Sequence, residues 1–285
     1  KTGENERAVP GAHALQCMEV WGGNTAIETG LSMPGLDAWI YSEPYRAEHS
    51  GGDIHYVSMC GAGKIGRFVL ADVAGHGSGV SDLAEQLRGL VRRSINRPDQ
   101  TRLARGLNRA FGRLSESGVF ATAALVSYFT PTDQLITCLA GHPRPLWYRA
   151  AEDTWRLLGP EDGDAEAGGG LPLGIIPRTE YTQFAVTLER GDLVLVYSDA
   201  LIEGGAEHGR GLGEDGLLAL ARTLDARRPD DLGRALIQAV DRHSGESVST
   251  RGDDLTLFVF HHNASDPPTR SLGEKARVLG RMLGL

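Results

Sequence analysis

Residues 68–77 read Phe-Val-Leu-Ala-Asp-Val-Ala-Gly-His-Gly, an apolar run that ends in an aspartate and leads into two glycines. The apolar start predicts a buried strand, and Gly75 and Gly77 predict a tight turn after it. From Val80 onward, apolar residues recur at the i, i+3, i+4, i+7 spacing of an amphipathic helix. The stretch therefore predicts a strand-to-helix junction with Asp72 at the strand end.

Three further positions place aspartates beside apolar runs in the same way: Gly-Gly-Asp at 51–53, Ser-Asp at 198–199 and Asp-Asp at 253–254. Each alone has a simple structural explanation as a turn, a helix cap or a solvated pair. An ionised Asp72 at the end of an apolar strand is nevertheless costly unless a cation or hydrogen bonds offset it. Mg²⁺ and Mn²⁺ take carboxylate oxygens as ligands. The four positions together therefore predict a site for hard divalent cations.

Hydrophobic patterns on both sides of this strand-to-helix junction predict the remaining strands and helices. Strands are predicted at 38–42, 54–59, 66–71, 119–129, 135–139, 146–149, 155–158, 181–188, 193–198 and 255–261. Helices are predicted at 80–95, after a cap at Asp99, at 214–224 and at 230–242. Strands, a helix pair, strands, a second helix pair and a last strand lack strict βαβ alternation. We therefore expect an α+β fold with antiparallel sheets and segregated helices.

Composition divides the chain into a Gly-rich N-terminal tail or linker at 1–35, one domain at 36–262 and a C-terminal tail at 263–285. The C-terminal tail carries apolar residues at the spacing of a short amphipathic helix. This helix packs on the domain or pairs with a second copy in a homodimer, and packing is the interpretation we favour.

The bulk numbers exclude several classes of protein. A net charge of −8 argues against nucleic acid as the main partner, because phosphate backbones attract basic surfaces. Cys17, Cys60 and Cys138 form no CxxC pair, which is typical of reduced thiols in a cytoplasmic protein. No signal peptide is visible at the start, and the longest apolar run, 119–129, is too short to span a bilayer. We expect a cytoplasmic protein without a membrane partner.

Six motifs in chain order carry a resemblance: GGD at 51–53, DVAGHG at 72–77, AGHPRP at 140–145, LPLG at 171–174, SD at 198–199 and DDLT at 253–256. The set resembles the bacterial SpoIIE/RsbU branch of the PP2C-like (PPM) metal-dependent protein phosphatases over roughly residues 36–262. The resemblance implies a four-layer α-β-β-α sandwich, with two antiparallel sheets flanked by helix pairs.

The resemblance also implies an activity: hydrolysis of phosphoserine or phosphothreonine by water activated at two Mn²⁺ or Mg²⁺ ions. The phosphorylated partner in such a family is usually a STAS-type anti-sigma-factor antagonist, which belongs to a partner-switching pathway that regulates a sigma factor. AGHPRP and LPLG are interpreted as turns that pack under the sheets, because Gly and Pro shape such turns.

The roles of the acids follow from the same resemblance. Asp72 bridges the two ions, and Asp53 with the backbone carbonyl of Val73 completes the site of one of them. Asp199 and Asp253 hold the other ion, with Asp254 as the second choice for Asp253. Asp53 and Asp72 are therefore the expected catalytic residues.

Several residues near these motifs are open to more than one interpretation. Ala200 stands where the family usually has glycine after the Ser-Asp pair, which could crowd the turn, and Glu203 stands where an acid is common. Arg46, seven residues before Asp53, is a candidate for binding the substrate phosphate. His76 is better explained as a helix-start histidine making local hydrogen bonds than as a general acid.

Two alternative functions stay open. A pseudophosphatase would keep the fold as a regulatory binding module without turnover, but such proteins lose acids, and this chain keeps all four positions. A metal-dependent hydrolase of small phosphate esters would use the same residues on a different substrate.

Overall fold

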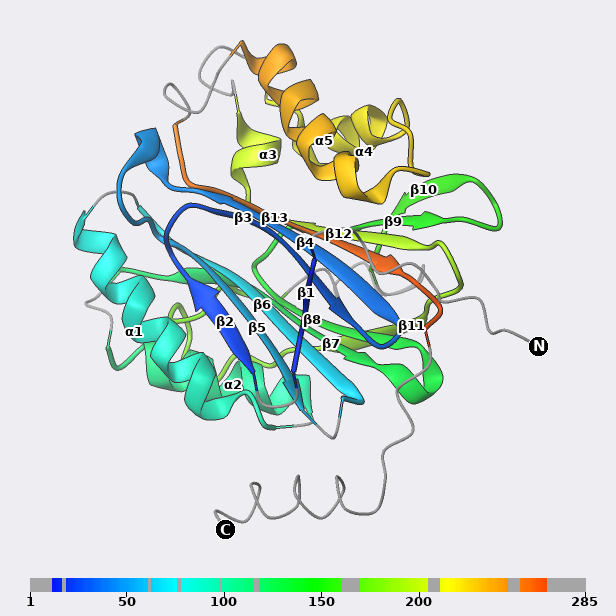
Figure 1. Cartoon of the computed structure of the whole chain (residues 1–285). Coiled ribbons are helices and arrows are strands. Elements are labelled where there is room, and N and C mark those ends of the chain that lie inside the picture. Colours follow the sequence, from blue (N-terminus) through cyan, green and yellow to red (C-terminus); the bar gives the residue numbers. More distant parts are fainter. Residues whose placement is uncertain are drawn as a thin grey trace.

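The computed structural model describes residues 12–16, 19–60, 63–75, 78–97, 99–114, 118–159, 170–204, 211–245 and 252–265. Two β-sheets face each other, and helices cover the outer face of each one (Figure 1). This is the predicted four-layer α-β-β-α sandwich. None of the described helices combines the length and apolar character needed to cross a bilayer.

The first sheet holds six strands in the order β11-β8-β7-β6-β5-β2, and every neighbouring pair is antiparallel. Their bounds are β2 Val20–Gly23, β5 Asp53–Cys60, β6 Ile65–Val73, β7 Ala121–Phe129, β8 Gln134–Ala140 and β11 Gln183–Thr187. Two helices pack on its outer face, α1 (Ser78–Ser94) and α2 (Gln100–Phe111). Short 3₁₀ turns lie at Tyr45–Ala47 and Thr130–Thr132.

The second sheet holds seven strands in the order β1-β3-β4-β13-β12-β9-β10. Their bounds are β1 His13–Ala14, β3 Ile27–Met33, β4 Leu36–Glu43, β9 Leu146–Arg149, β10 Thr154–Leu157, β12 Leu193–Tyr197 and β13 Leu255–His262. All pairs are antiparallel except β1 with β3, which is parallel. The helices α3 (Ala200–Glu203), α4 (Gly213–Ala221) and α5 (Pro229–Ser244) cover its outer side.

Three apolar cores hold these layers together. The central core lies between the sheets, where the Phe68 and Phe260 rings have centroids 4.5 Å apart. The other two lie between the first sheet and α1 and α2, and between the second sheet and its helices. The strands in the middle of each sheet therefore bury both faces, which is why runs such as 68–71 and 193–197 are continuously apolar.

The predicted helices after 80 and after Asp99 are confirmed. Asp99 caps α2 by accepting hydrogen bonds from the backbone N–H groups of Thr101 and Arg102. The α+β fold with its two helix pairs is confirmed as well.

The predicted tail at 1–35 is wrong over its second part, because β2 and β3 lie there and belong to the two sheets. The sequence pattern hides β2 because this strand needs glycine for close packing. A Cβ on Gly22 would stand 2.8 Å from the carbonyl oxygen of His55. Glycine relieves this contact and removes the alternation that marks a strand. Of the C-terminal tail predicted at 263–285, residues 266–285 with the amphipathic helix lie outside the described residues.

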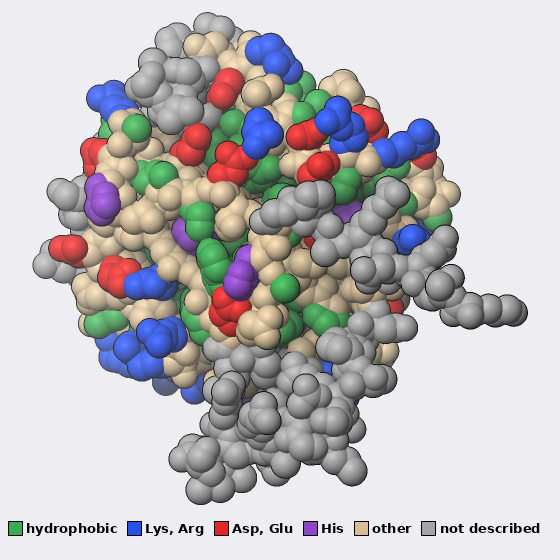
Figure 2. Space-filling model, viewed as in Figure 1, with side chains coloured by type: hydrophobic (Ala, Val, Ile, Leu, Met, Phe, Trp, Pro, Cys, Tyr) green, Lys and Arg blue, Asp and Glu red, His purple; other side chains and the backbone are tan. Residues whose placement is uncertain are grey.

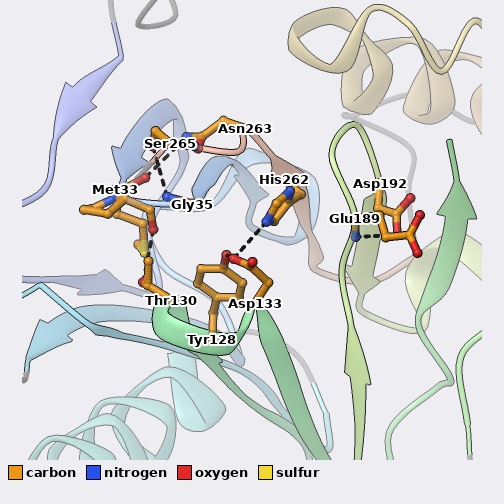
Figure 3. Close-up of polar contacts among 11 residues, drawn as sticks. Met33, Gly35, Tyr128, Thr130, Asp133, Glu189, Asp192, His262, Asn263 and Ser265 are labelled. Carbon is orange, nitrogen blue, oxygen red and sulfur yellow. Dashed lines mark hydrogen bonds and ion pairs between the residues drawn. The ribbon is translucent and has the colours of Figure 1, made fainter. Parts of the chain in front are cut away.

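Polar contacts join the two sheets at the end opposite to Asp72 (Figure 3). The Tyr128 hydroxyl in β7 donates to Asp133 at 2.6 Å, and Nε2 of His262 in β13 lies 3.0 Å from the same carboxylate. Gly35, with φ +80°, leaves room here, since a Cβ would overlap the Tyr128 hydroxyl. These contacts fix β7 against β13.

Candidate metal centre

Both sheets contribute acids to one end of the sandwich. Asp53 begins β5 and Asp72 lies near the end of β6, and the two are direct register partners on neighbouring strands. Asp199 follows β12 and Asp253 precedes β13 in the second sheet. Like charges directly opposite each other on paired strands are destabilising. The acids predicted from the sequence therefore lie at one end of the sandwich, and the described residues do not neutralise their combined negative charge.

Asp53 is the most isolated of these acids. Its side chain is 3% exposed, and neither carboxylate oxygen has a hydrogen-bond partner in the described part of the chain. Burial, and then the charges of Asp72 and Asp254, hold its pKa well above the usual range, against a smaller opposing effect of the Thr256 and Ser198 hydroxyls. A buried carboxyl with so raised a pKa would be held in its charged form by a bound cation.

Asp72 and Asp199 are shifted in the same direction. Burial raises the pKa of Asp72 well above its usual range, and the charges of Asp199, Asp253, Asp254 and Glu203 add to the effect. Burial, followed by Asp253 and Glu203, raises the pKa of Asp199 to about 6. Perturbed carboxylates of this kind gather at functional sites.

The donor set fits a hard divalent cation. The predicted ligands are all carboxylate or carbonyl oxygens, which Mg²⁺ and Mn²⁺ prefer over nitrogen or sulfur. No three His, Cys, Asp or Glu side chains in the described part of the chain lie close enough together to form a finished ligand group. The fit therefore rests on the unpaired Asp53 carboxylate and on the mutual repulsion of its neighbours.

Asp254 has a different task from Asp253. One of its oxygens accepts the backbone N–H of Tyr45 at 2.6 Å, and the other accepts the N–H of Gly52 at 2.6 Å. Asp254 is 2% exposed, so it acts as a buried clamp on the loop before β5. Asp253 is half-buried, and its Oδ1 accepts the Asp254 N–H at 2.8 Å. The geometry supports Asp253 as the ligand and Asp254 as the residue that positions Asp53.

The clamp explains the glycines of the Gly-Gly-Asp motif. A Cβ on Gly51 would overlap the Asp254 carboxylate, and a Cβ on Gly52 would stand 2.9 Å from the carbonyl oxygen of Val73. The Val73 carbonyl therefore lies next to the turn that leads into Asp53. This is the position expected of a carbonyl that binds the same ion as Asp53.

The remaining predicted residues lie around this centre. Ala200 begins α3 without a positive φ, so alanine in place of glycine does not crowd the turn after Asp199. Arg46 is exposed and stacks over the Tyr45 ring at 4.9 Å, one residue from the amide that Asp254 clamps. Its φ of 48° is unusual for a residue other than glycine. His76 lies outside the described residues.

His142 belongs to the AGHPRP motif, which the sequence predicts to be a packed turn. Its ring is buried, with Nδ1 3.1 Å from the hydroxyl of Thr122, the register partner of Asp72. Burial lowers its pKa to about 3, against a smaller opposing effect of the Tyr197 backbone, so the ring is neutral at physiological pH. His142 therefore lies between β7, the strand that pairs with the strand of Asp72, and β12, the strand before Asp199. The motif was visible in the sequence, but its place beside the acids was not.

We expect the Asp199→Asn variant to be more stable than the wild type at pH 7.5 in chelator, by about 1–3 kcal/mol. The folded pKa of about 6 lies above the usual 3.8, so this carboxyl costs stability that builds up as pH rises from about 4 to 6 and is fully present above pH 6. The difference should vanish toward pH 4, where the acid is protonated in both states. Denaturant unfolding across this pH range measures it, and a variant that is less stable at pH 7.5 would contradict the raised pKa.

Comparisons with known proteins agree with this geometry. The sequence profile of the Stage II sporulation protein E (SpoIIE) family matches residues 64–263. The phosphoserine phosphatase RsbU of Bacillus subtilis (strain 168) is 29% identical over 109 residues, which make up 38% of this chain and 30% of RsbU. The chain thus matches less than a third of the length of this curated relative.

Two solved structures share the fold. The RsbU and RsbW domains of a Mycobacterium tuberculosis protein give a TM-score of 0.67 at 24% identity, covering 90% of this chain and 70% of that one. The PP2C phosphatase domain of SpoIIE from Bacillus subtilis, with a fragment of its regulatory domain, gives 0.62 at 16% identity, covering 86% and 64%. The predicted PP2C-like sandwich is confirmed.

Proposed function

The chain belongs to the SpoIIE family, whose profile matches residues 64–263, and we propose that it is a metal-dependent protein serine/threonine phosphatase. The observation that carries the proposal is the buried Asp53 carboxylate, which has no hydrogen-bond partner among the described residues and is the register partner of Asp72 on the neighbouring strand. A similarity to the phosphoserine phosphatase RsbU supports the substrate class.

The chain's own residues hold and orient the reacting groups. Asp72, with Asp53 and the Val73 carbonyl on one side and Asp199 and Asp253 on the other, would hold two Mn²⁺ or Mg²⁺ ions. Such ions lower the pKa of water and neutralise phosphate oxygens. Asp254 fixes the loop before Asp53 through two backbone amides.

Arg46 is exposed on the loop that Asp254 clamps, one residue from the clamped Tyr45 amide, and a guanidinium suits phosphate recognition. We assign it to the substrate phosphate. The neutral His142 ring holds Thr122 on β7, the strand that pairs with the strand of Asp72.

The substrate we propose is a phosphorylated STAS-type anti-sigma-factor antagonist in a partner-switching pathway. The similarity to the RsbU and RsbW domains of one mycobacterial protein supports a place among such regulators. A protein substrate also agrees with the exposed position of Arg46.

Phosphate release from a phosphoserine STAS protein and from p-nitrophenyl phosphate tests the proposal. We expect turnover with Mn²⁺ or Mg²⁺, complete loss with EDTA and recovery on adding metal back. The phosphoprotein should be the better substrate by kcat/KM. Turnover that is insensitive to chelator contradicts the metal centre, absence of turnover on any phosphoprotein favours the pseudophosphatase, and a strong preference for small esters favours the small-ester hydrolase.

A further inference from the structure

A cavity with a strongly basic lining lies along α2, and none of the predicted metal-binding acids belongs to this lining. It encloses about 500 Å³ between α2 and the segment 177–180. Arginine makes up most of the lining, which consists of Arg97, Arg102, Arg105, Arg109, Pro177, Arg178, Thr179 and Glu180. The proposed phosphatase centre uses none of these residues.

The positive charge of this cavity is not balanced locally. Five guanidiniums meet two carboxylates, Glu180 in the lining and Asp99 beside it, which leaves an excess of three positive charges (5 − 2) in a chain of net charge −8. Arg105 pairs with Glu180 at 2.8 Å, and Arg102 pairs with Asp99 at 3.3 Å. Arg97, Arg109 and Arg178 make no ion pair with the described residues. An ordinary solvated helix face would alternate both signs of charge, whereas α2 contains no acidic residue.

The walls of the cavity are fixed by buried contacts. Asn108 is 1% exposed, accepts the Gly174 N–H at 2.8 Å and donates to the Ile176 carbonyl at 2.8 Å. The Thr179 hydroxyl donates to the same carbonyl at 2.8 Å. The opposite face of α2 is buried in the core through Leu103 and Leu107. The arginines at 102, 105 and 109 therefore share one exposed helix face beside a positioned segment.

The residues in and around the cavity indicate which kind of anion would bind there. Ile175 and Ile176, which are 46% and 48% exposed, directly precede the lining segment that begins at Pro177. The lining has no aromatic ring on which a nucleobase would stack. Arginine binds carboxylates through two parallel hydrogen bonds. Lys and Arg side chains also gather over α1 at the lower left of the molecule, on the helical side of the first sheet (Figure 2).

We propose that this cavity binds an acidic segment of a partner protein, with carboxylates on Arg102, Arg105 and Arg109 and an apolar side chain on Ile175 and Ile176. A basic surface attracts such a segment over a distance of about one Debye length, roughly 8 Å at physiological ionic strength. The inference does not depend on phosphatase activity, because the cavity and the acids share no residue.

Fluorescence anisotropy with a labelled peptide of sequence EEIDEIED tests the inference on the full chain. We expect saturable binding near physiological ionic strength, and no binding of the neutral analogue QQINQIQN. Arg105→Gln with Arg109→Gln should weaken binding at least tenfold. The matched control, Arg227→Gln with Arg228→Gln, removes the same charge from outside the cavity and should change binding less than twofold.

Thermal unfolding and hydrolysis of p-nitrophenyl phosphate verify that both variants are folded. An equal loss of binding in both variants would show non-specific charge attraction and overturn the inference. Tight binding of inorganic tripolyphosphate without binding of the peptide would assign the cavity to a small polyanion and overturn it as well. Arg105→Lys with Arg109→Lys, which keeps the charge, should show a partial loss if paired hydrogen bonds matter.

Discussion

Asp72→Asn is expected to lower kcat/KM by about 10³-fold or more, the largest effect of any single substitution in this chain. The change removes the anion that the other acids surround, so the affinity for divalent cations falls with it. In chelator the same variant should be more stable than the wild type, because burial and four neighbouring acids no longer oppose its charge. Steady-state kinetics, calorimetric Mn²⁺ titration and denaturant unfolding measure the three effects.

Asp153→Asn is the matched control for this substitution. Asp153 accepts the Tyr148 hydroxyl at 2.7 Å in the second sheet and has a φ of 52°, which asparagine tolerates well. The control should keep its activity and its cation affinity. An Asp72→Asn variant that keeps the activity of the wild type would remove Asp72 from the metal centre.

The second large effect separates two adjacent aspartates. Asp254→Asn should lower the free energy of unfolding by about 2–4 kcal/mol, because an amide NH₂ would replace one of the two acceptors that hold backbone N–H groups. Asp253→Asn keeps an oxygen for the Asp254 N–H, so its stability should change little. Its cation affinity should fall instead by about 10–100-fold.

Urea unfolding in chelator and Mn²⁺ titration of both variants measure this contrast. Gly51→Ala provides an independent check, since its Cβ would overlap the Asp254 carboxylate and should reproduce the stability loss of Asp254→Asn. If Asp253→Asn unfolds the chain while Asp254→Asn only weakens cation binding, the assignment of clamp and ligand is reversed.

Most of the fold could be predicted from the sequence, because buried strands and amphipathic helices leave strong patterns. The runs that became β6, β7, β12 and β13 are apolar on both faces, since each lies in the middle of a sheet. β2 could not be predicted, because Gly22 and Gly23 carry no side chains to alternate. β1 and α3 are too short for any periodicity to appear.

The acids of the site could be predicted as a group, but their separate roles could not. Asp253 and Asp254 are identical neighbours, and only the backbone direction decides which one faces the amides of Tyr45 and Gly52. The place of His142 depends on the packing of β7, which joins Thr122 to Asp72. Such contacts arise between segments that are distant in sequence, so no local pattern contains them.

The position of β13 has a consequence for how the chain is made. This strand is the last of the described elements, yet it lies between β4 and β12 in the second sheet, where Leu36 pairs with His262. During translation the second sheet remains split until β13 leaves the ribosome. Contacts between segments so distant in sequence slow folding and expose strand edges meanwhile. Because Asp253 arrives with β13, a nascent chain should not hold its complete set of acids before the sheet can close.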